Sequence, residues 1–322
     1  MRRIAFIIAC LLASVLPGGA QAQDYPARPI KLVVPIGAGG GTDILARHVA
    51  QKMSERLRQA TIVENRPGAG TVVGTEYVAK SAPDGYTLLM GGIFNMVMNK
   101  ALLKNLPYEP QRDFVPIGYI SAYPFVLVGR ADLPPADLSQ LVRYASERPG
   151  KLTYGSPGLG TLQHVWATIF LKSVGLDLVH VPFKAAPAVH QEMLAGRIDL
   201  MMDNLSAVKH HVQSGRLKAY AVSSAARTRE LEAVPTFKET GVANFEGESW
   251  FAMFAPAATP GSIVSLLRNT VAEIQRQTDF AARVDKDGGR VLAIPAGQQE
   301  RFLRDEIERW SALANRYGVG VD

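Results

Sequence analysis

Hydrophobic positions along the chain alternate between short buried-strand runs and helical spacing. The first strand run covers residues 30–34, and Ile44, Leu45 and Val49 recur at helical spacing just beyond it. The same order of strand, loop and helix repeats along the chain with short connections. This alternation is typical of α/β domains whose sheets are largely parallel and covered by helices on both faces. The pattern therefore predicts an α/β fold.

Two longer apolar runs interrupt this alternation. Residues 114–129 carry Pro124 near their middle, and residues 250–256 form a second buried run. Since proline is disfavoured inside a central strand, we interpret the first run as a segment that crosses between two domains and the second as the return crossing. This interpretation makes the first domain discontinuous, with residues 23–123 and 249–322, and assigns residues 124–248 to the second domain.

The first 22 residues have the pattern of a secretory signal peptide. Arg2 and Arg3 precede an apolar run, residues 4–16, and a small-residue site ends at Ala22. The apolar run is shorter than the ~20 residues that span a bilayer. We therefore predict cleavage after Ala22 and an exported, soluble mature chain that begins at Gln23.

Cysteine content and charge narrow the functional classes. Cys10, the only cysteine, lies in the predicted signal peptide, so the mature chain would have neither disulfides nor a thiol catalyst. Of 35 basic residues, 33 remain after removal of Arg2 and Arg3; against 29 acidic residues they give a net charge of +4. This balance favours an anionic small molecule, and without a basic run we expect no nucleic-acid partner.

Two glycine-rich loops each join a predicted strand to a predicted helix. They cover residues 35–41 and 155–160. Glycines let the backbone approach a ligand, and the first amides of a helix have no partner within it, so each loop can bind an anion. Ligands lie outside the carboxyl ends of strands in open α/β sheets, so we expect the two loops to face each other and to share one carboxylate. Taken alone, the first loop could equally be an ordinary strand-to-helix turn.

Short motifs in a fixed order cover nearly all of the predicted mature chain, and together they are specific. With them the chain resembles the Bug or TctC-like solute-binding proteins of tripartite tricarboxylate transporters. The motifs are YPARPIKLVVPIGAGGGTDILAR (25–47), NRPGAG (65–70), PDGYTLL (83–89), LPYEPQRDFVPIG (106–118), YGSPGLGTLQH (154–164), VPFKAAPA (181–188), GRIDLMMDN (196–204), WFAMFAPAATP (250–260) and EIERW (306–310).

The resemblance implies a two-domain, type II-like periplasmic binding protein that closes on its ligand, a di- or tricarboxylate or an aromatic acid. It assigns the binding of one carboxylate to the amides of both loops. Carried onto this chain, the binding residues are Gly39, Gly40, Gly41, Thr42, Ser156, Gly158, Gly160 and Thr161. The chain departs from the family pattern at Ile36-Gly37, where Phe-Pro is frequent, and at Ala185, where glycine is common. Because position 36 lacks the aromatic side chain frequent in the family, the resemblance does not fix the pocket wall at Ile36 or the identity of the ligand.

Four further residues are candidates for the site. Asp43 has a structural interpretation, helix capping, beside ligand contact. His164 lies one helical turn past Thr161, where it points to the cleft or makes a local hydrogen bond. Asp203 ends a predicted strand, as ligand or as turn residue, and Asn95 follows another strand as a candidate for the distal part of the ligand.

Enzymatic and metal-binding functions lack their motifs. Ser156 is not in a Gly-x-Ser-x-Gly elbow, and neither glycine loop has the spacing of a nucleotide site. His190, His210 and His211 match no zinc pattern. We therefore expect no enzyme, no cofactor and no metal. The expected protein is a monomer that delivers a small carboxylate to the integral membrane subunits of a tripartite tricarboxylate transporter; a periplasmic protein that signals the ligand to a sensor kinase is the alternative.

Overall fold

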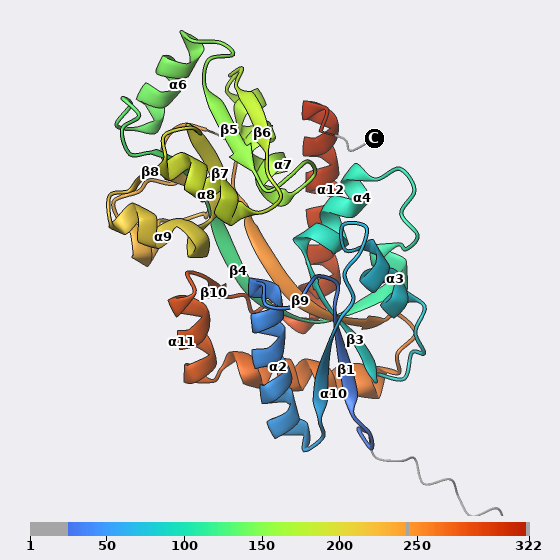
Figure 1. The fold of residues 1–322 in the computed structure, drawn as a ribbon. Coiled ribbons are helices and arrows are strands. Elements are labelled where there is room, and N and C mark those ends of the chain that lie inside the picture. Colours follow the sequence, from blue (N-terminus) through green and yellow to red (C-terminus); the bar gives the residue numbers. More distant parts are fainter. Residues whose placement is uncertain (1–24, 243–244, 320–322) are drawn as a thin grey trace, which may run out of the picture.

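Two long strands connect two lobes, each built around part of a continuous sheet (Figure 1). The computed structural model describes residues 25–242 and 245–319, so the predicted signal peptide lies outside the described chain. β4 (Phe114–Arg130) pairs antiparallel with β9 (Glu248–Pro256) as far as Pro124. From Phe125 onward, β4 pairs instead with β7 (Leu200–Asn204) and β8 (Leu217–Val222).

Pro124 therefore lies where β4 changes partners, and the predicted crossing is a single strand of 17 residues. A proline has no amide hydrogen to donate, so it fits best where a ladder ends. The division into residues 23–123 with 249–322 and residues 124–248 stays a prediction, which this change of partners supports.

In the first lobe, β1 (Ile30–Val34) lies parallel to β2 (Thr61–Asn65) on one side and to β3 (Thr87–Gly92) on the other. β3 pairs antiparallel with β9, and the short β10 (Arg290–Val291) pairs antiparallel with β4. Parallel pairing thus belongs to the alternating units, and antiparallel pairing to the crossings. The helices of this lobe are α2 (Gly41–Leu57), α3 (Val72–Ala79), a π-helix (Phe94–Met98), α4 (Asn99–Leu102), α5 (Pro110–Asp113), α10 (Gly261–Gln275) and α11 (Thr278–Lys286).

Successive side chains of β1 point to opposite faces of the sheet, and both faces are buried. Leu32 packs in a cluster with residues of α2 and α10, such as Val49 and Leu267, whereas Val33 belongs to the cluster on the other face. The helix predicted just beyond the first strand run is α2, whereas α11 had not been predicted. It packs through Phe280 and Val284 in the same cluster as Leu32.

The second lobe repeats the arrangement of the first. β5 (Thr153–Ser156) lies parallel to β6 (Val179–Pro182) and to β7. Its helices are α6 (Leu138–Ser146), α7 (Leu162–Ser173), α8 (Ala186–Leu194), α9 (Leu205–Gln213) and a 3₁₀ turn (Arg229–Leu231). Within residues 25–242 and 245–319, no helix combines the length and the apolar character needed to cross a membrane.

The last helix, α12 (Gln299–Tyr317), follows a 3₁₀ turn (Ala296–Gln298) and packs against both lobes (Figure 1). Trp310 of α12 contacts Trp166 of α7 in the second lobe, with ring centroids 4.9 Å apart. Phe302 of α12 contacts Tyr119 of β4, with centroids 4.7 Å apart.

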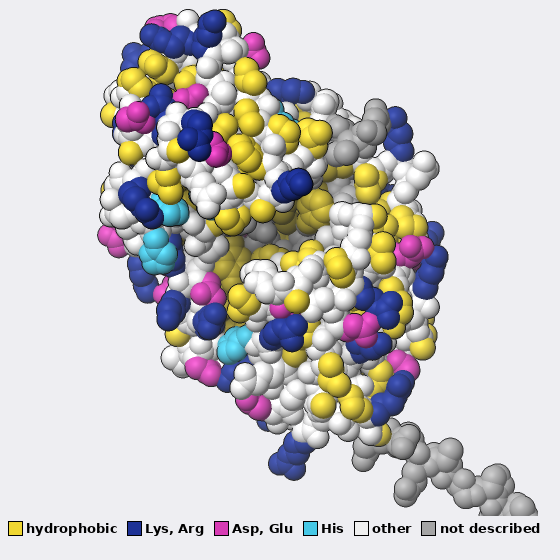
Figure 2. Space-filling view, viewed as in Figure 1, with side chains coloured by type: hydrophobic (Ala, Val, Ile, Leu, Met, Phe, Trp, Pro, Cys, Tyr) yellow, Lys and Arg dark blue, Asp and Glu magenta, His cyan; other side chains and the backbone are white. Residues whose placement is uncertain are grey.

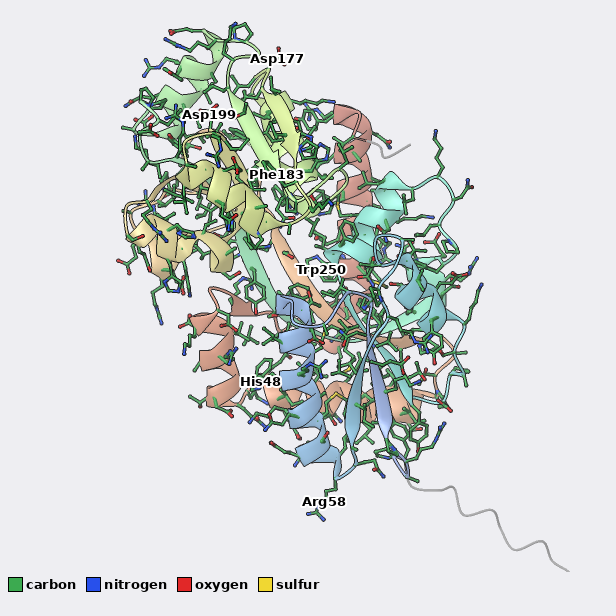
Figure 3. All side chains as sticks on the ribbon, viewed as in Figure 1. His48, Arg58, Asp177, Phe183, Asp199 and Trp250 are labelled. Atoms are coloured by element: carbon green, nitrogen blue, oxygen red, sulfur yellow. The ribbon has the colours of Figure 1, made fainter. Side chains whose placement is uncertain are left out.

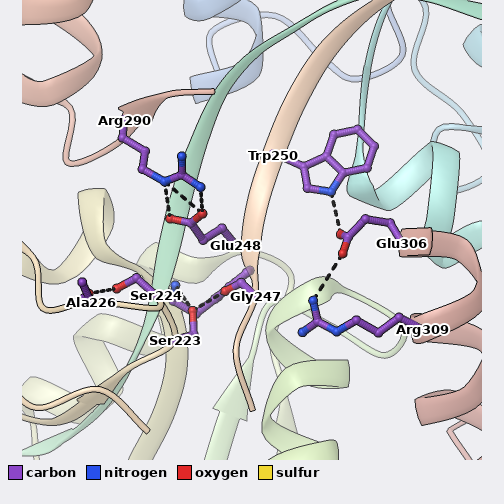
Figure 4. Close-up of polar contacts among 10 residues, drawn as sticks. Ser223, Ser224, Ala226, Gly247, Glu248, Trp250, Arg290, Glu306 and Arg309 are labelled. Carbon is purple, nitrogen blue, oxygen red and sulfur yellow. Dashed lines mark hydrogen bonds and ion pairs between the residues drawn. The ribbon is translucent and has the colours of Figure 1, made fainter. Parts of the chain in front are cut away.

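Polar contacts fix the first residues of β9, where the chain returns to the first lobe (Figure 4). Trp250 donates its indole N–H to Glu306 of α12 (2.9 Å), which also accepts from Arg309 (3.2 Å). Glu248 pairs with Arg290, which begins β10. The return crossing is thus tied to α12 and to β10.

Candidate functional site

The surface is hollowed between the two lobes, and hydrophobic side chains gather there (Figure 2). An inner cavity of about 300 Å³ lies in this cleft, which is the lower end of the range for small-ligand pockets. Both lobes and β9 contribute to its walls. It is lined by Pro35, Ile36, Thr42, Thr71, Met90, Gly91, Gly92, Ile93, Phe94, Asn95, Thr161, Leu162, Gln163, Asn204, Ser249, Trp250 and Phe251.

The N-termini of α2 and α7 both reach this cavity, one from each lobe. α2 begins at Gly41 with Gly40 as its N-cap, and Thr42 of its first turn lines the cavity. α7 begins at Leu162 with Thr161 as its N-cap, and both residues line the cavity. The structure therefore brings the helix starts after both glycine loops to one cleft, where the partial positive charges of the two helices converge.

A buried carboxylate organises the first loop. Asp43, only 2% exposed, accepts hydrogen bonds from the Gly39 amide (2.9 Å), Arg47 (3.0 Å) and Asn65 (2.9 Å). The hydrogen bond from Arg47, aided by those from Gly39 and Asn65, lowers the pKa of Asp43 to about 2. Asp43 is the third residue of α2 rather than its N-cap, and it reaches back to the loop in the manner of a capping box. These contacts support its structural interpretation.

The second loop is organised by neutral groups. Ser156, at the end of β5, is fully buried and lies 2.7 Å from Nε2 of His180, on β6. The Gly158 amide donates to the Ser156 hydroxyl oxygen (3.2 Å). Thr161 donates its hydroxyl hydrogen to the Gly158 carbonyl (2.8 Å) and accepts from the His164 amide as the cap of α7. Ser156 thus stabilises the loop through its buried hydroxyl group, which accepts from the Gly158 amide.

His164 also bonds within this loop. Its Nδ1 accepts from the Gly160 amide (3.2 Å), so the hydrogen of the neutral ring is on Nε2. Its ring packs 4.4 Å from that of His180, centroid to centroid. Burial, and secondarily the neighbouring His180, lowers the pKa of His164 to about 4. The local hydrogen bond, one of the two predicted roles of His164, is therefore present.

The amides available to a ligand differ between the loops. In the second loop, those of Gly158, Gly160 and Thr161 already donate to Ser156, His164 and the Gly158 carbonyl. The first helical positions, which have no partner within α7, are Leu162 and Gln163, and both line the cavity. In the first loop the corresponding positions are Gly41 and Thr42.

Asp203 and Asn95 have hydrogen-bond partners within the protein. Asp203, 1% exposed, lies 2.7 Å from His190 Nε2 and accepts from the Gln163 side chain (3.2 Å). Asn95 lines the inner cavity, but its amide oxygen accepts from the Gly92 amide (2.8 Å) and its amide nitrogen donates to Thr75 (2.9 Å). Both residues therefore position their neighbours at the cleft.

Several cavity residues had not been predicted as site residues: Thr71, Leu162, Gln163, Asn204, Ser249 and Phe251. Trp250 lies on β9 between the lobes (Figure 3), and it combines a packing role with a cavity wall. The side-chain oxygen of Asn204 is buried without a hydrogen-bond partner among the described residues. Asn204 ends the motif GRIDLMMDN next to Asp203, and this position at a strand end was the sequence signal that could have identified it as a site residue.

Among the described residues, no cluster of His, Cys, Asp or Glu could bind a metal ion.

Similar solved structures define the class of the protein. A structure titled "R. palustris Rpa4515 with adipate" is 33% identical, with a TM-score of 0.82, and covers 92% of this chain and 99% of that chain. The periplasmic binding protein BugD is 32% identical, with a TM-score of 0.79, and covers 92% of this chain and 99% of that chain. MatC from Rhodopseudomonas palustris with bound malate is 30% identical, with a TM-score of 0.78, and covers 90% and 99%. The fold is that of a two-domain periplasmic binding protein.

Sequence relatives define the family. Residues 45–319 match the family described as the tripartite tricarboxylate transporter family receptor, TctC. Protein BugT of Bordetella pertussis is 33% identical over 322 residues, which cover 99% of this chain and 98% of BugT. The chain belongs to this Bug/TctC family of solute-binding receptors, as its motifs had indicated.

Proposed function

We propose that the chain is the periplasmic receptor of a tripartite tricarboxylate transporter and binds a small organic carboxylate between its lobes. The observation that carries this proposal is the convergence of two helix N-termini, at Thr42 and Thr161, on one cavity. Helix starts bind anions through free amides and the helix dipole, so a carboxylate needs no lysine or arginine there. Adipate and malate, bound to two solved relatives, are acids of this class.

Binding is proposed to close the lobes over the ligand, and the closed monomer would then present its surface to the integral membrane subunits. A ligand that contacts both helix starts favours the closed arrangement by its extra affinity for that state. The chain would act by binding, without catalysis or a cofactor. The predicted signal peptide would place it in the periplasm.

The test is a thermal-shift titration with a panel of carboxylic acids. A ligand at a hundredfold excess over its Kd stabilises the folded protein by about 3 kcal/mol. We expect Thr161→Tyr to abolish this stabilisation because its ring fills the space between the helix starts. Thr278→Tyr is the matched control, since Thr278 is an exposed residue at the start of α11. Unchanged stabilisation of Thr161→Tyr would refute the site.

A further inference from the structure

The cleft consists of two adjoining compartments. The inner cavity of about 300 Å³ adjoins an outer cavity of about 550 Å³. Five residues line both cavities and form the divider between them: Thr42, Gln163, Asn204, Ser249 and Phe251. Gly41 borders the outer cavity, and Leu162 borders the inner cavity. The first amides of α2 and α7 therefore lie at the divider.

Formal charge is confined to the outer compartment. Its lining includes Lys209, Arg283 and Lys286, together with Asp203 and Asp287. None of the described residues that line the inner cavity is an acid, a base or a histidine. A carboxylate in the inner cavity would lose its hydration without gaining a counter-ion, and such a transfer is strongly unfavourable. For a ligand that occupies the inner cavity, the anionic group therefore fits at the divider, where the amides of both helix starts converge.

The inner walls are predominantly apolar. Ile36, Met90, Ile93, Phe94, Leu162 and Phe251 supply side chains from both lobes and from β9. Trp250 adds an aromatic wall whose orientation is fixed, since its N–H donates to Glu306 and its ring packs 5.1 Å from that of Tyr119. That N–H is consequently not available to a ligand.

Few polar groups remain to recognise a second polar end inside the inner cavity. The oxygen and nitrogen of the Asn95 side chain are already bonded to Gly92 and Thr75. The side-chain amide of Gln163 donates to Asp203 at the divider. An apolar ligand body would bury its surface against these walls at about 25 cal/mol per Å², whereas a second carboxylate would find neither charge nor sufficient donors.

We propose that the ligand is a compact monocarboxylate with an aromatic or alicyclic body. The body occupies the inner compartment and the carboxylate lies at the divider, against the first amides of α2 and α7. This inference rests on the proposed carboxylate-binding function and narrows its ligand class. The outer compartment, whose lining has three cationic side chains against two carboxylates, is the route by which the anion reaches the divider.

The experiment is isothermal titration of the protein with benzoate, cyclohexanecarboxylate, adipate, malate and cyclohexanecarboxamide. We expect at least one ring monocarboxylate to bind about tenfold or more tightly than adipate or malate. The uncharged amide should bind at least about tenfold more weakly than its acid, because it lacks the anionic group. Equal or tighter binding of adipate or malate would overturn the inference.

A charge added to the inner compartment should change the preference. Ile36→Arg supplies the missing cation, so we expect it to reduce the preference for the ring acids over adipate by about tenfold. Ile62→Arg is the matched control, since Ile62 is 56% exposed on β2 and lines neither compartment. It should leave the preference unchanged. Should Ile36→Arg fail to fold by circular dichroism, the titration of the unaltered protein still decides the question.

The outcomes separate this inference from the proposed function. If adipate or malate binds best and Thr161→Tyr abolishes that binding, the receptor function stands and the monocarboxylate inference fails. If none of the four acids binds, the result counts against both. If a ring acid binds best but Thr161→Tyr has no effect, the proposed site fails, and with it the placement of the ligand in the inner compartment.

Discussion

The two loops at the cleft have the same architecture, but one depends on a charged group and the other on neutral groups. The first depends on an ionised carboxylate, Asp43, which accepts from Gly39, Arg47 and Asn65. The second depends on Ser156 and His164, both uncharged. Hydrogen bonds to charged groups are roughly twice as strong as neutral ones, so the first loop has the stronger support. The same strand–loop–helix geometry can thus be stabilised in two ways that respond differently to mutation and to pH.

The largest expected effect comes from removal of the carboxylate. We expect Asp43→Ala to lower the free energy of unfolding by about 3 kcal/mol, because buried donors lose their charged acceptor. Ser156→Ala, in the second loop, should cost about 1 kcal/mol. Urea denaturation measures both. Asp305→Ala is the control, since Asp305 pairs with Arg301 on an exposed face of α12 and should change stability by under about 0.5 kcal/mol. Equal losses for the Asp43 and Ser156 variants would contradict the comparison.

Acidification should weaken the second loop before the first. The pKa of His164 falls from its ordinary 6.5 to about 4 in the folded chain, so its contribution to stability is complete above pH 6.5 and declines as the pH falls toward 4. The pKa of Asp43 falls from 3.8 to about 2, so its contribution persists down to pH 3.8 and is lost below that.

This difference is measured by urea denaturation between pH 7 and pH 5. In His164→Asn the amide oxygen replaces Nδ1 as the acceptor. Between pH 7 and pH 5 we expect the free energy of unfolding of this variant to fall by about 1–2 kcal/mol less than that of the unaltered protein. The exposed His210→Asn is the control and should leave the pH dependence as it is. A His164→Asn variant with the full pH dependence would show that His164 does not link the second loop to pH.

The smallest effect concerns the backbone of the first loop. Gly39 has a φ of +86° and open space around an added Cβ, so Gly39→Ala should cost about 1 kcal/mol through backbone strain alone. Gly37 also has open space but no positive φ, and Gly37→Ala should be neutral or slightly stabilising. Urea denaturation of the pair isolates the strain. Equal stabilities would show that the loop relaxes around Gly39.

The sequence predicted the fold well because alternation and glycine loops are local signals. Both strand–loop–helix units were predicted at nearly their observed positions, and so was the crossing at residues 114–129. α11 was not predicted, since the burial of its apolar face depends on Phe280 and Val284 meeting a cluster from distant strands.

The site was predicted less completely. The sequence indicated which loops meet, but not that the amides of Gly158 and Gly160 have partners within the second loop. One of those partners depends on His180, which comes from a different strand and supports Ser156. Such contacts form only when the chain has folded. The divider residues Asn204 and Ser249 likewise come together only through the packing of the lobes.

The position of α12 has a consequence for biosynthesis. Trp310 and Phe302 complete the packing around Trp166 and Tyr119, which belong to segments made much earlier. A nascent chain therefore cannot finish either lobe until its final helix has left the ribosome. For a chain exported by the predicted signal peptide, this late completion would keep the polypeptide unfolded during its passage through a translocon.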